Sequence, residues 1–214
     1  MDKLFTPIDI YCERTSDLMW AEPVNAFTNF FFVIAGLHIL YLLKKQGNSS
    51  LWLQALSVNT ILVGLGSFLF HTFANFWSMW ADILPIMILI CANFYFVLKY
   101  IFRFSHLYAG IFIFLFFLLG FALTVVVPPI LNGSLMYAHA LVALIAVAWL
   151  TKSRHKKISR FYFMATLVFI FSLFFRTVDP SACEFFPLGT HFLWHTLNSV
   201  TIWLVLKGNL ELKQ

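Results

Sequence analysis

The sequence predicts an all-α membrane protein: a bundle of seven transmembrane helices, with the N-terminus outside and the C-terminus in the cytoplasm. Of the 214 residues, 61% are hydrophobic and only 11% are charged, whereas a soluble domain has about 25% charged residues. A chain with so little polar surface needs lipid as its solvent. Apolar stretches of membrane-spanning length occur at residues 26–43, 52–73, 80–98, 107–127, 135–150, 160–175 and 188–206.

Short polar connections separate the seven stretches. The first stretch follows Glu22-Pro23, which is a typical helix start. Turn residues occur at 47–50, before the second stretch, and at 128–133, after the fourth. Because no connection is long enough for a separate soluble domain, we expect residues 1–214 to form a single membrane domain.

Lys and Arg in the loops predict the orientation, because short cytoplasmic loops carry an excess of them. One side carries eleven: Lys44, Lys45, Lys99, Arg103, Lys152, Arg154, Lys156, Lys157, Arg160, Lys207 and Lys213. The other side carries three: Lys3, Arg14 and Arg176. The first side is therefore predicted to be cytoplasmic. The net charge of +5 then reflects topology, and nucleic acid is not expected as a partner.

Residues 1–25 are predicted to form an acidic segment outside the cytoplasm. The segment has no apolar run after a basic start, so we expect no cleavable signal peptide. The short loops favour a bacterial inner membrane, with the endoplasmic reticulum or Golgi as the alternative.

The second, third and seventh stretches carry polar residues, which are costly in lipid unless they are paired or liganded. Ser67 and His71 lie one turn apart near the end of the second stretch, and Asp82 lies about one turn inside the third. His191 and His195 lie one turn apart at the start of the seventh. At 1.5 Å per residue, all five lie within about 10 Å of the outer boundary.

These residue types are typical of a catalytic zinc site. His191 and His195 can bind one ion together, and His71 completes a three-ligand site with the fourth position open to water. Zinc lowers the pKa of that water to about 7. Asp82 is then a candidate general base and acid, and Ser67 a candidate donor to the developing oxyanion. The alternatives are a helix-capping Asp82 and a Ser67 bonded to its own helix.

Other prominent side chains are not site candidates. The Phe-rich run at residues 112–117 is expected to face lipid. The remaining histidines lie at other depths or in loops, and they are His38, His106, His139 and His155.

At these five positions the sequence resembles the alkaline ceramidase family. That family belongs to a group of seven-helix membrane hydrolases that also includes the adiponectin and progestin receptors and phospholipases that remodel GPI anchors. The group shares Ser-x-x-x-His on the second helix, Asp at the start of the third, and His-x-x-x-His on the seventh. The resemblance implies that His71, His191 and His195 bind zinc, with Asp82 and Ser67 beside the bound water.

The N-terminal segment favours the ceramidases within this group. It contains an Asp…Cys-Glu…Ala-Glu…Asn…Asn run that is similar to theirs. The resemblance implies a calcium site formed by the acids of this run, here Asp9, Glu13, Asp17 and Glu22. The alternative is a solvated acidic tail with helix-capping acids.

The N-terminal segment also departs from the family pattern. The interval between Cys12 and Glu22 is shorter, one residue is added between Asp9 and Cys12, and Thr15 stands where a ligand Asn is expected. Cys12 and Cys183 both fall on the outer side, where disulfides persist, and Cys91 lies within the third stretch. Since the ceramidases have a similar arrangement, a Cys12–Cys183 disulfide is expected.

We therefore predict a zinc-dependent amidase that hydrolyses ceramide or a related N-acyl lipid to a fatty acid and a long-chain amine. The alternatives are a receptor or sensor with a structural zinc site, and a lipid esterase or phospholipase of the same group. Paired histidines also hold haem iron, but Ser67 and Asp82 favour zinc. A retinal protein is not expected, because Lys207 lies at the inner end of the seventh stretch.

Overall fold

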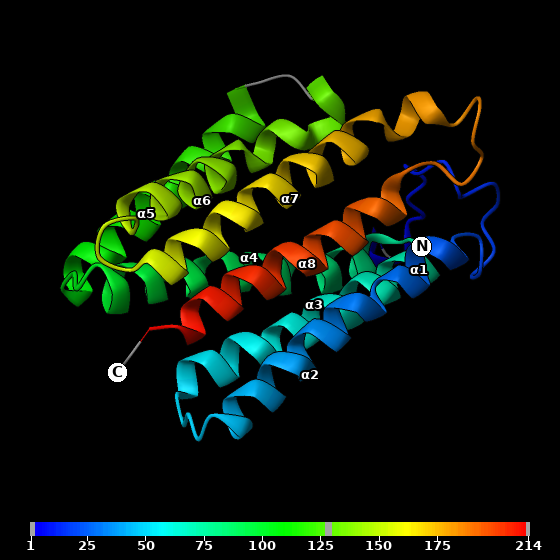
Figure 1. The fold of residues 1–214 in the computed structure, drawn as a ribbon. Coiled ribbons are helices and arrows are strands. Elements are labelled where there is room, and N and C mark those ends of the chain that lie inside the picture. Colours follow the sequence, from blue (N-terminus) through cyan, green and yellow to red (C-terminus); the bar gives the residue numbers. More distant parts are fainter. Residues whose placement is uncertain (1–2, 127–129, 213–214) are drawn as a thin grey trace.

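The computed structural model describes residues 3–126 and 130–212, and the long elements in these ranges are all helices (Figure 1). The α-helices are α1 (Pro23–Thr28), α2 (Phe30–Lys45), α3 (Leu51–Phe73), α4 (Phe76–Phe96), α5 (His106–Val126), α6 (Ala138–Leu150), α7 (Lys156–Ala182) and α8 (His191–Leu210). Only Asn29 separates α1 from α2, and the two together form one span of Pro23–Lys45. The described ranges therefore contain the seven long helices that the sequence predicts.

Three of the sequence predictions fall on residues outside the described ranges. These are the end of the fourth stretch at residue 127, the turn residues Pro128 and Pro129, and the cytoplasmic charge of Lys213.

Six of the described helices are long and apolar enough to cross a membrane, which makes the chain a multi-pass membrane protein. They are Pro23–Lys45, Leu51–Phe73, Phe76–Ile101, His106–Leu123, Leu131–Leu150 and Lys156–Ala182. The seventh helix, α8, is more polar because it carries His191, His195 and Asn209 among its apolar residues. It nevertheless lies inside the bundle, where it packs against α2 and α7 (Figure 1).

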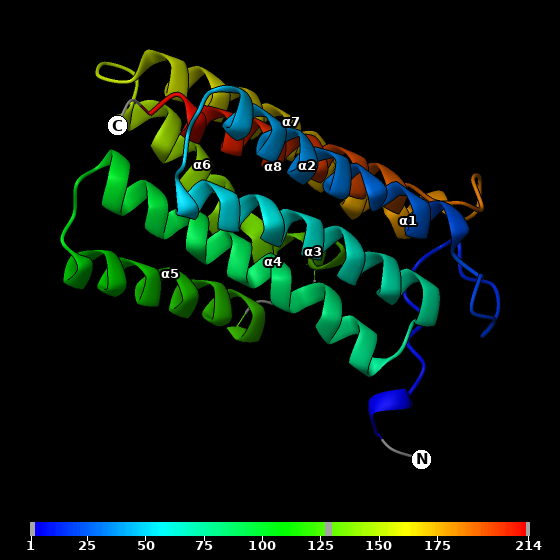
Figure 2. The same cartoon turned by 90° about the horizontal axis from the view of Figure 1, so that it is seen from below.

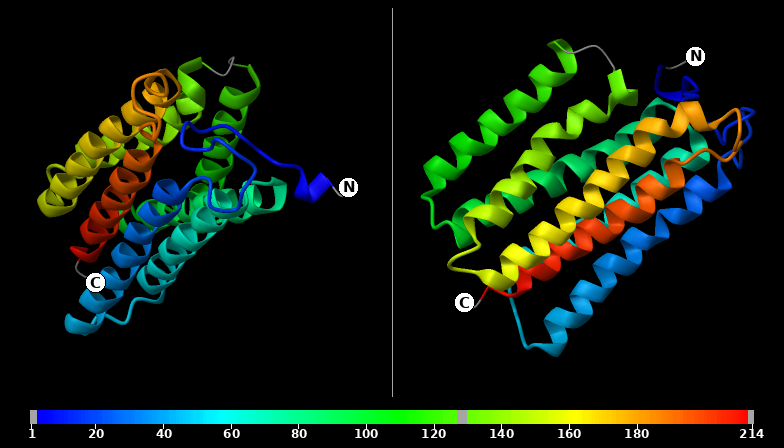
Figure 3. Two further views of the ribbon diagram at one scale, coloured as in Figure 1. Left: turned by 90° about the vertical axis from the view of Figure 1, so that its right-hand side faces the viewer. Right: turned by 45° about the horizontal axis from the view of Figure 1, so that its top comes forward.

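The helices pack mainly as neighbours in the chain, with α8 closing the bundle. α3 packs between α2 and α4, and α7 packs between α6 and α8. Figure 2 shows α5 at the edge of the bundle beside α4, and both views of Figure 3 show the connection from α7 to α8 at the same end as the N-terminal segment. Phe112, Phe114 and Phe117 on α5 are exposed, as expected for side chains that face lipid.

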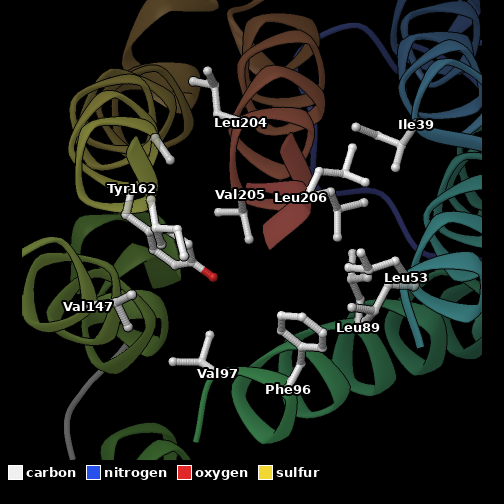
Figure 4. Packing of buried hydrophobic residues seen from close by; sticks show 14 of the residues in the cluster. Ile39, Leu53, Leu89, Phe96, Val97, Val147, Tyr162, Leu204, Val205 and Leu206 are labelled. Carbon is white, nitrogen blue, oxygen red and sulfur yellow. The ribbon is translucent and has the colours of Figure 1, made fainter. Parts of the chain in front are cut away.

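The apolar core lies in the half of the bundle that contains the C-terminus. Figure 4 shows side chains from different helices meeting there, among them Ile39, Leu53, Phe96, Tyr162 and Val205. The Tyr162 hydroxyl is buried among them and donates to Oδ1 of Asn209 at 2.9 Å. Because the apolar side chains pack together in this half, polar side chains can be placed in the other half of the bundle.

The sixth predicted stretch ends too early, at residue 175, whereas α7 continues to Ala182. Pro180 lies inside the last turns of α7 and has no N–H to donate to the carbonyl of Arg176. The side-chain amide of Asn132 donates to that carbonyl instead, at 2.8 Å. This substitute bond stabilises the extension, so Arg176 lies within a helix rather than in the predicted outer loop.

Candidate metal centre

The connection between α3 and α4 is tight, and it sets the position of Asp82. α3 ends where Ala74 adopts a left-handed conformation with φ of 43°. α4 begins after Asn75, whose side chain forms a reciprocal capping box with Ser78. Because α4 begins before the predicted start at residue 80, Asp82 lies in its second turn. The alternative in which Asp82 caps this helix is therefore wrong.

α3 and α4 approach closely beside the site. At Gly66, a Cβ atom would lie 2.0 Å from the carbonyl oxygen of Ala81, so the backbones meet only because this residue has no side chain. The next residue, Ser67, is within hydrogen-bonding reach of the Asp82 carboxylate. Oδ1 of Asp82 is buried and has no hydrogen-bond partner among the residues that the structure describes.

His71, His191 and His195 converge from α3 and α8. Their side chains are buried, with 1%, 2% and 3% of each residue exposed. One ring nitrogen from each lies within 4.8 Å of the others. Two zinc–nitrogen bonds span at most about 4.2 Å, so this separation is close to that of a shared ion.

The contacts of the ring nitrogens supply a test of whether the three histidines suit a metal. Nδ1 of His71 bonds to Oε2 of Glu22 at 2.5 Å, and Nδ1 of His195 lies 3.2 Å from the Thr28 hydroxyl. These contacts orient both rings, as carboxylates and hydroxyls commonly do for metal-bound histidines. Nδ1 of His191 is buried with no hydrogen-bond partner in the described ranges. A cation would satisfy such nitrogen donors, so the cluster is compatible with a metal site.

Glu22 and Arg14 form a charged pair behind His71. Nε of Arg14 donates to Oε1 of Glu22 at 2.5 Å, and both side chains are almost fully buried. Burial alone would raise the pKa of Glu22, but the bond to His71 and the Arg14 charge together hold that pKa below its ordinary value. The sequence prediction assigned Glu22 to calcium and did not connect it to His71, because the contact joins residues 49 positions apart.

Tyr11 covers the histidines from the N-terminal segment. Its ring stacks on His191 with the centroids 3.8 Å apart and lies 5.1 Å from the ring of His71. Burial raises the pKa of Tyr11 above its ordinary value. The position of Tyr11 is not predictable from the sequence, since a lone tyrosine outside the spans has no distinguishing spacing.

The predicted disulfide between Cys12 and Cys183 is confirmed, with the Cα atoms 5.2 Å apart. It joins the N-terminal segment to the connection between α7 and α8. Gly189 in that connection has φ of +63°, and a Cβ atom there would lie 2.7 Å from Cβ of Cys12. The disulfide therefore packs against a backbone position that only glycine accommodates.

Asp179 fixes the start of α8. Its Oδ1 accepts hydrogen bonds from the backbone N–H groups of Thr190, at 2.6 Å, and His191, at 2.9 Å. A carboxylate at this position stabilises the N-terminus of a helix. This residue was not among the predicted site residues, because the sixth stretch was predicted to end at residue 175, before Asp179.

The four residues predicted to bind calcium have different environments. Glu13 and Glu22 are buried, whereas Asp9 and Asp17 are exposed. The two carboxylate oxygens of Glu13 accept from the backbone N–H groups of Val24 and Asn25, at 2.7 and 2.8 Å. Glu13 thus stabilises the start of α1, and calcium binding by the set stays a prediction.

Arg176 is a further charged residue near the site. Its guanidinium lies over the ring of Trp194 at 5.1 Å and over the ring of Tyr137 at 5.5 Å. The Nε atom is buried without a hydrogen-bond partner among the described residues. A cation inside a span is unusual, so Arg176 belongs with the polar groups of this half of the bundle.

Comparison with known families identifies a match over most of the chain. A family model described as Ceramidase matches residues 9–208, which run from the N-terminal segment to the last turns of α8. No curated protein matches the sequence significantly.

Proposed function

The chain belongs to the ceramidase family, and on that premise we propose that it is a zinc-dependent lipid amidase of the membrane interior. Family membership implies amide hydrolase activity on a ceramide-like lipid. In the proposed reaction, water adds to the amide carbonyl and the carbon–nitrogen bond breaks. The products are a fatty acid and a long-chain amine, from ceramide or a related N-acyl lipid.

The observation that carries the proposal is the buried cluster of His71, His191 and His195 beside Asp82 and Ser67. Three nitrogen donors that leave one position open are typical of catalytic zinc sites. Bound there, zinc would supply a Lewis acid for the carbonyl and would lower the pKa of water. The second contact of His71, with Glu22, supports this role because metal-binding histidines commonly donate to a carboxylate.

The chain's own residues would move the proton. Asp82 accepts a proton from the attacking water and returns it to the leaving nitrogen, as a general base and then a general acid. Ser67 donates its hydroxyl hydrogen to the oxygen of the scissile carbonyl. Tyr11 and the surrounding helices exclude bulk water, which strengthens these electrostatic interactions.

We also propose that the N-terminal segment and the metal centre lie at the non-cytoplasmic face, with the C-terminus in the cytoplasm. The Cys12–Cys183 disulfide supports this orientation, because disulfides persist in oxidising compartments. The excess of Lys and Arg at the opposite end also supports it. The lipid would then enter from the outer leaflet, of a bacterial inner membrane or else of the endoplasmic reticulum or Golgi.

Metal analysis coupled to lipid hydrolysis tests the proposal. Purified protein should contain about one zinc per chain and release fatty acid from ceramide-like lipids, and a strong chelator should abolish both. His71→Ala and His195→Ala should lose zinc and turnover, because each removes a ligand. His155→Ala, in the connection before α7 at the other end of the bundle, is the matched control and should keep both.

The outcome of the same assay separates the rival functions. Full turnover in either ligand variant would contradict the mechanism. Stoichiometric zinc without cleavage of any lipid would favour a receptor or sensor with a structural zinc site. Cleavage of esters or phospholipids in place of amides would favour the esterase or phospholipase alternative.

A further inference from the structure

Arg14 is a buried cation whose guanidinium is surrounded by oxygen atoms. Its side chain is only 4% exposed. Besides the bond to Glu22, Nη1 donates to the backbone carbonyls of Ser16 and Leu18, at 3.2 and 3.4 Å. Nη2 donates to the backbone carbonyl of His71 at 3.3 Å. A guanidinium presents five N–H donors in a planar fork, so one side chain satisfies four oxygens from three parts of the chain.

One carboxylate and three carbonyls are also the kind of oxygen donors that calcium prefers. The described structure does not suit calcium at this point, however, because Arg14 already holds these oxygens. The second oxygen of Glu22 is bonded to His71, and both oxygens of Glu13 are bonded to the start of α1. A divalent cation would have to displace Arg14, since two buried cations on one carboxylate repel each other.

The contacts of Arg14 reach a metal ligand by two routes. Nη2 holds the backbone of His71 directly, and Nε holds the carboxylate of Glu22, whose other oxygen holds the His71 ring. Without Arg14, the buried Glu22 carboxylate would lose its fixed positive partner, and an unpaired buried charge is strongly destabilising. Arg14 therefore controls both the charge and the direction of the group that orients this ligand.

We propose that Arg14 is a built-in cation that takes the place of calcium in this chain and positions Glu22 against His71. The inference rests on the proposed metal centre. Because Arg14 occupies the position of the calcium ion, zinc retention and turnover should not depend on the calcium concentration. Arg14 is a positioning residue, because it touches a ligand and the ligand's partner but not the reacting atoms.

Calorimetric titration of calcium chloride into the purified wild-type protein tests the proposal first, with zinc content and turnover measured at each calcium concentration. No calcium binding and unchanged turnover are expected. Arg14→Met should weaken zinc binding about 10–100-fold, which is the usual effect of losing an outer-shell partner. Calcium should restore much of that loss in Arg14→Met, because the same oxygens become available. Arg154→Met, in an exposed connection, is the matched control and should behave as wild type.

Three results would overturn the proposal. They are calcium bound stoichiometrically by the wild-type protein, wild-type zinc affinity in Arg14→Met, and a defect in Arg14→Met that calcium does not relieve. If Arg14→Met does not fold, Arg14→Lys replaces it: it keeps the charge without the fork, so it should bind zinc more weakly than the wild type and should still bind no calcium. The wild-type titration requires no turnover, so its result is independent of whether the lipid amidase reaction is correct.

Discussion

Asp82 and Asp179 are both buried carboxylates close to the candidate metal centre, but their surroundings indicate different roles. Asp179 accepts two backbone N–H bonds at the start of α8 and is thereby fixed as a structural cap. Asp82 is within hydrogen-bonding reach of Ser67 and keeps one buried oxygen without a partner in the described part of the chain. Oδ2 of Asp179 is likewise buried without a partner there, so the difference lies in the two backbone N–H bonds that fix the Asp179 carboxylate. Asp82, which lies beside Ser67, is the better candidate for proton transfer.

Asp82→Asn tests that assignment. The amide has nearly the same shape but cannot accept a proton, so kcat should fall about 10²–10⁴-fold while zinc content stays at the wild-type level. Steady-state kinetics with metal analysis on the same preparation measures both. Glu184→Gln, an exposed position in the connection after α7, is the control. An unchanged kcat in Asp82→Asn would remove the aspartate from the mechanism.

The convergence of His71, His191 and His195 could be predicted from the sequence, because regular spacing exposed shared helix faces. The pairs Ser67/His71 and His191/His195 are each one turn apart, and their depth in the membrane could be estimated from the helix rise. Arg14 and Tyr11 reach the centre from an irregular segment. Nothing in their local sequence specifies a contact with residues more than fifty positions away.

At the scale of elements, the close contact between α3 and α4 holds Ser67 next to Asp82. Gly66→Ala would place a methyl group 2.0 Å from the carbonyl oxygen of Ala81, which forces the two helices apart. We expect a loss of about 1–3 kcal/mol of stability, together with reduced turnover because the Ser67–Asp82 pair separates. Thermal unfolding in detergent and lipid hydrolysis measure the two effects.

Gly110→Ala is the matched control for this substitution. Gly110 lies on α5, and a Cβ atom there would meet nothing within 4 Å. The control should unfold at or slightly above the wild-type temperature, because alanine has the higher helix propensity. Equal stability of the two variants would show that the α3–α4 contact is looser than its geometry implies.

The seven helices were predictable because hydrophobic length reports on membrane crossing, but their ends were not. α4 begins before residue 80 because Asn75 and Ser78 cap it, and capping depends on side-chain conformation. α7 passes Pro180 because Asn132, from a different part of the chain, satisfies the carbonyl that the proline leaves unpaired. The start of α4 and the end of α7 both depend on specific hydrogen bonds, which a hydropathy pattern cannot predict.

At the scale of the whole molecule, the Cys12–Cys183 disulfide joins residues separated by 171 positions. Cys12→Ser should lower the free energy of unfolding by about 2–5 kcal/mol, because a cross-link over a long loop restricts the unfolded chain. It should also weaken zinc retention, since Tyr11 and Arg14 lie within two residues of the cysteine. Thermal unfolding and metal analysis, with and without reductant, test both expectations.

Cys91→Ser is the control, because Cys91 is the free cysteine of the described chain and lies within α4. Reductant should change the wild type and the Cys91→Ser protein alike, but should leave Cys12→Ser as it was. If reductant did not change the melting temperature of the wild-type protein, this result would contradict the stabilising role of the disulfide.

The polarity of α8 has a consequence for how the protein is made. This helix follows the other described helices in the chain, and with two histidines and two asparagines it is a weak candidate for entering the lipid on its own. We expect α8 to enter the bilayer only by docking onto the earlier helices, whose polar groups contact the polar side chains of α8. Insertion of α8 and completion of the His71, His191 and His195 cluster are then a single event in biogenesis, so we expect a nascent chain to bind metal only after α8 has been inserted.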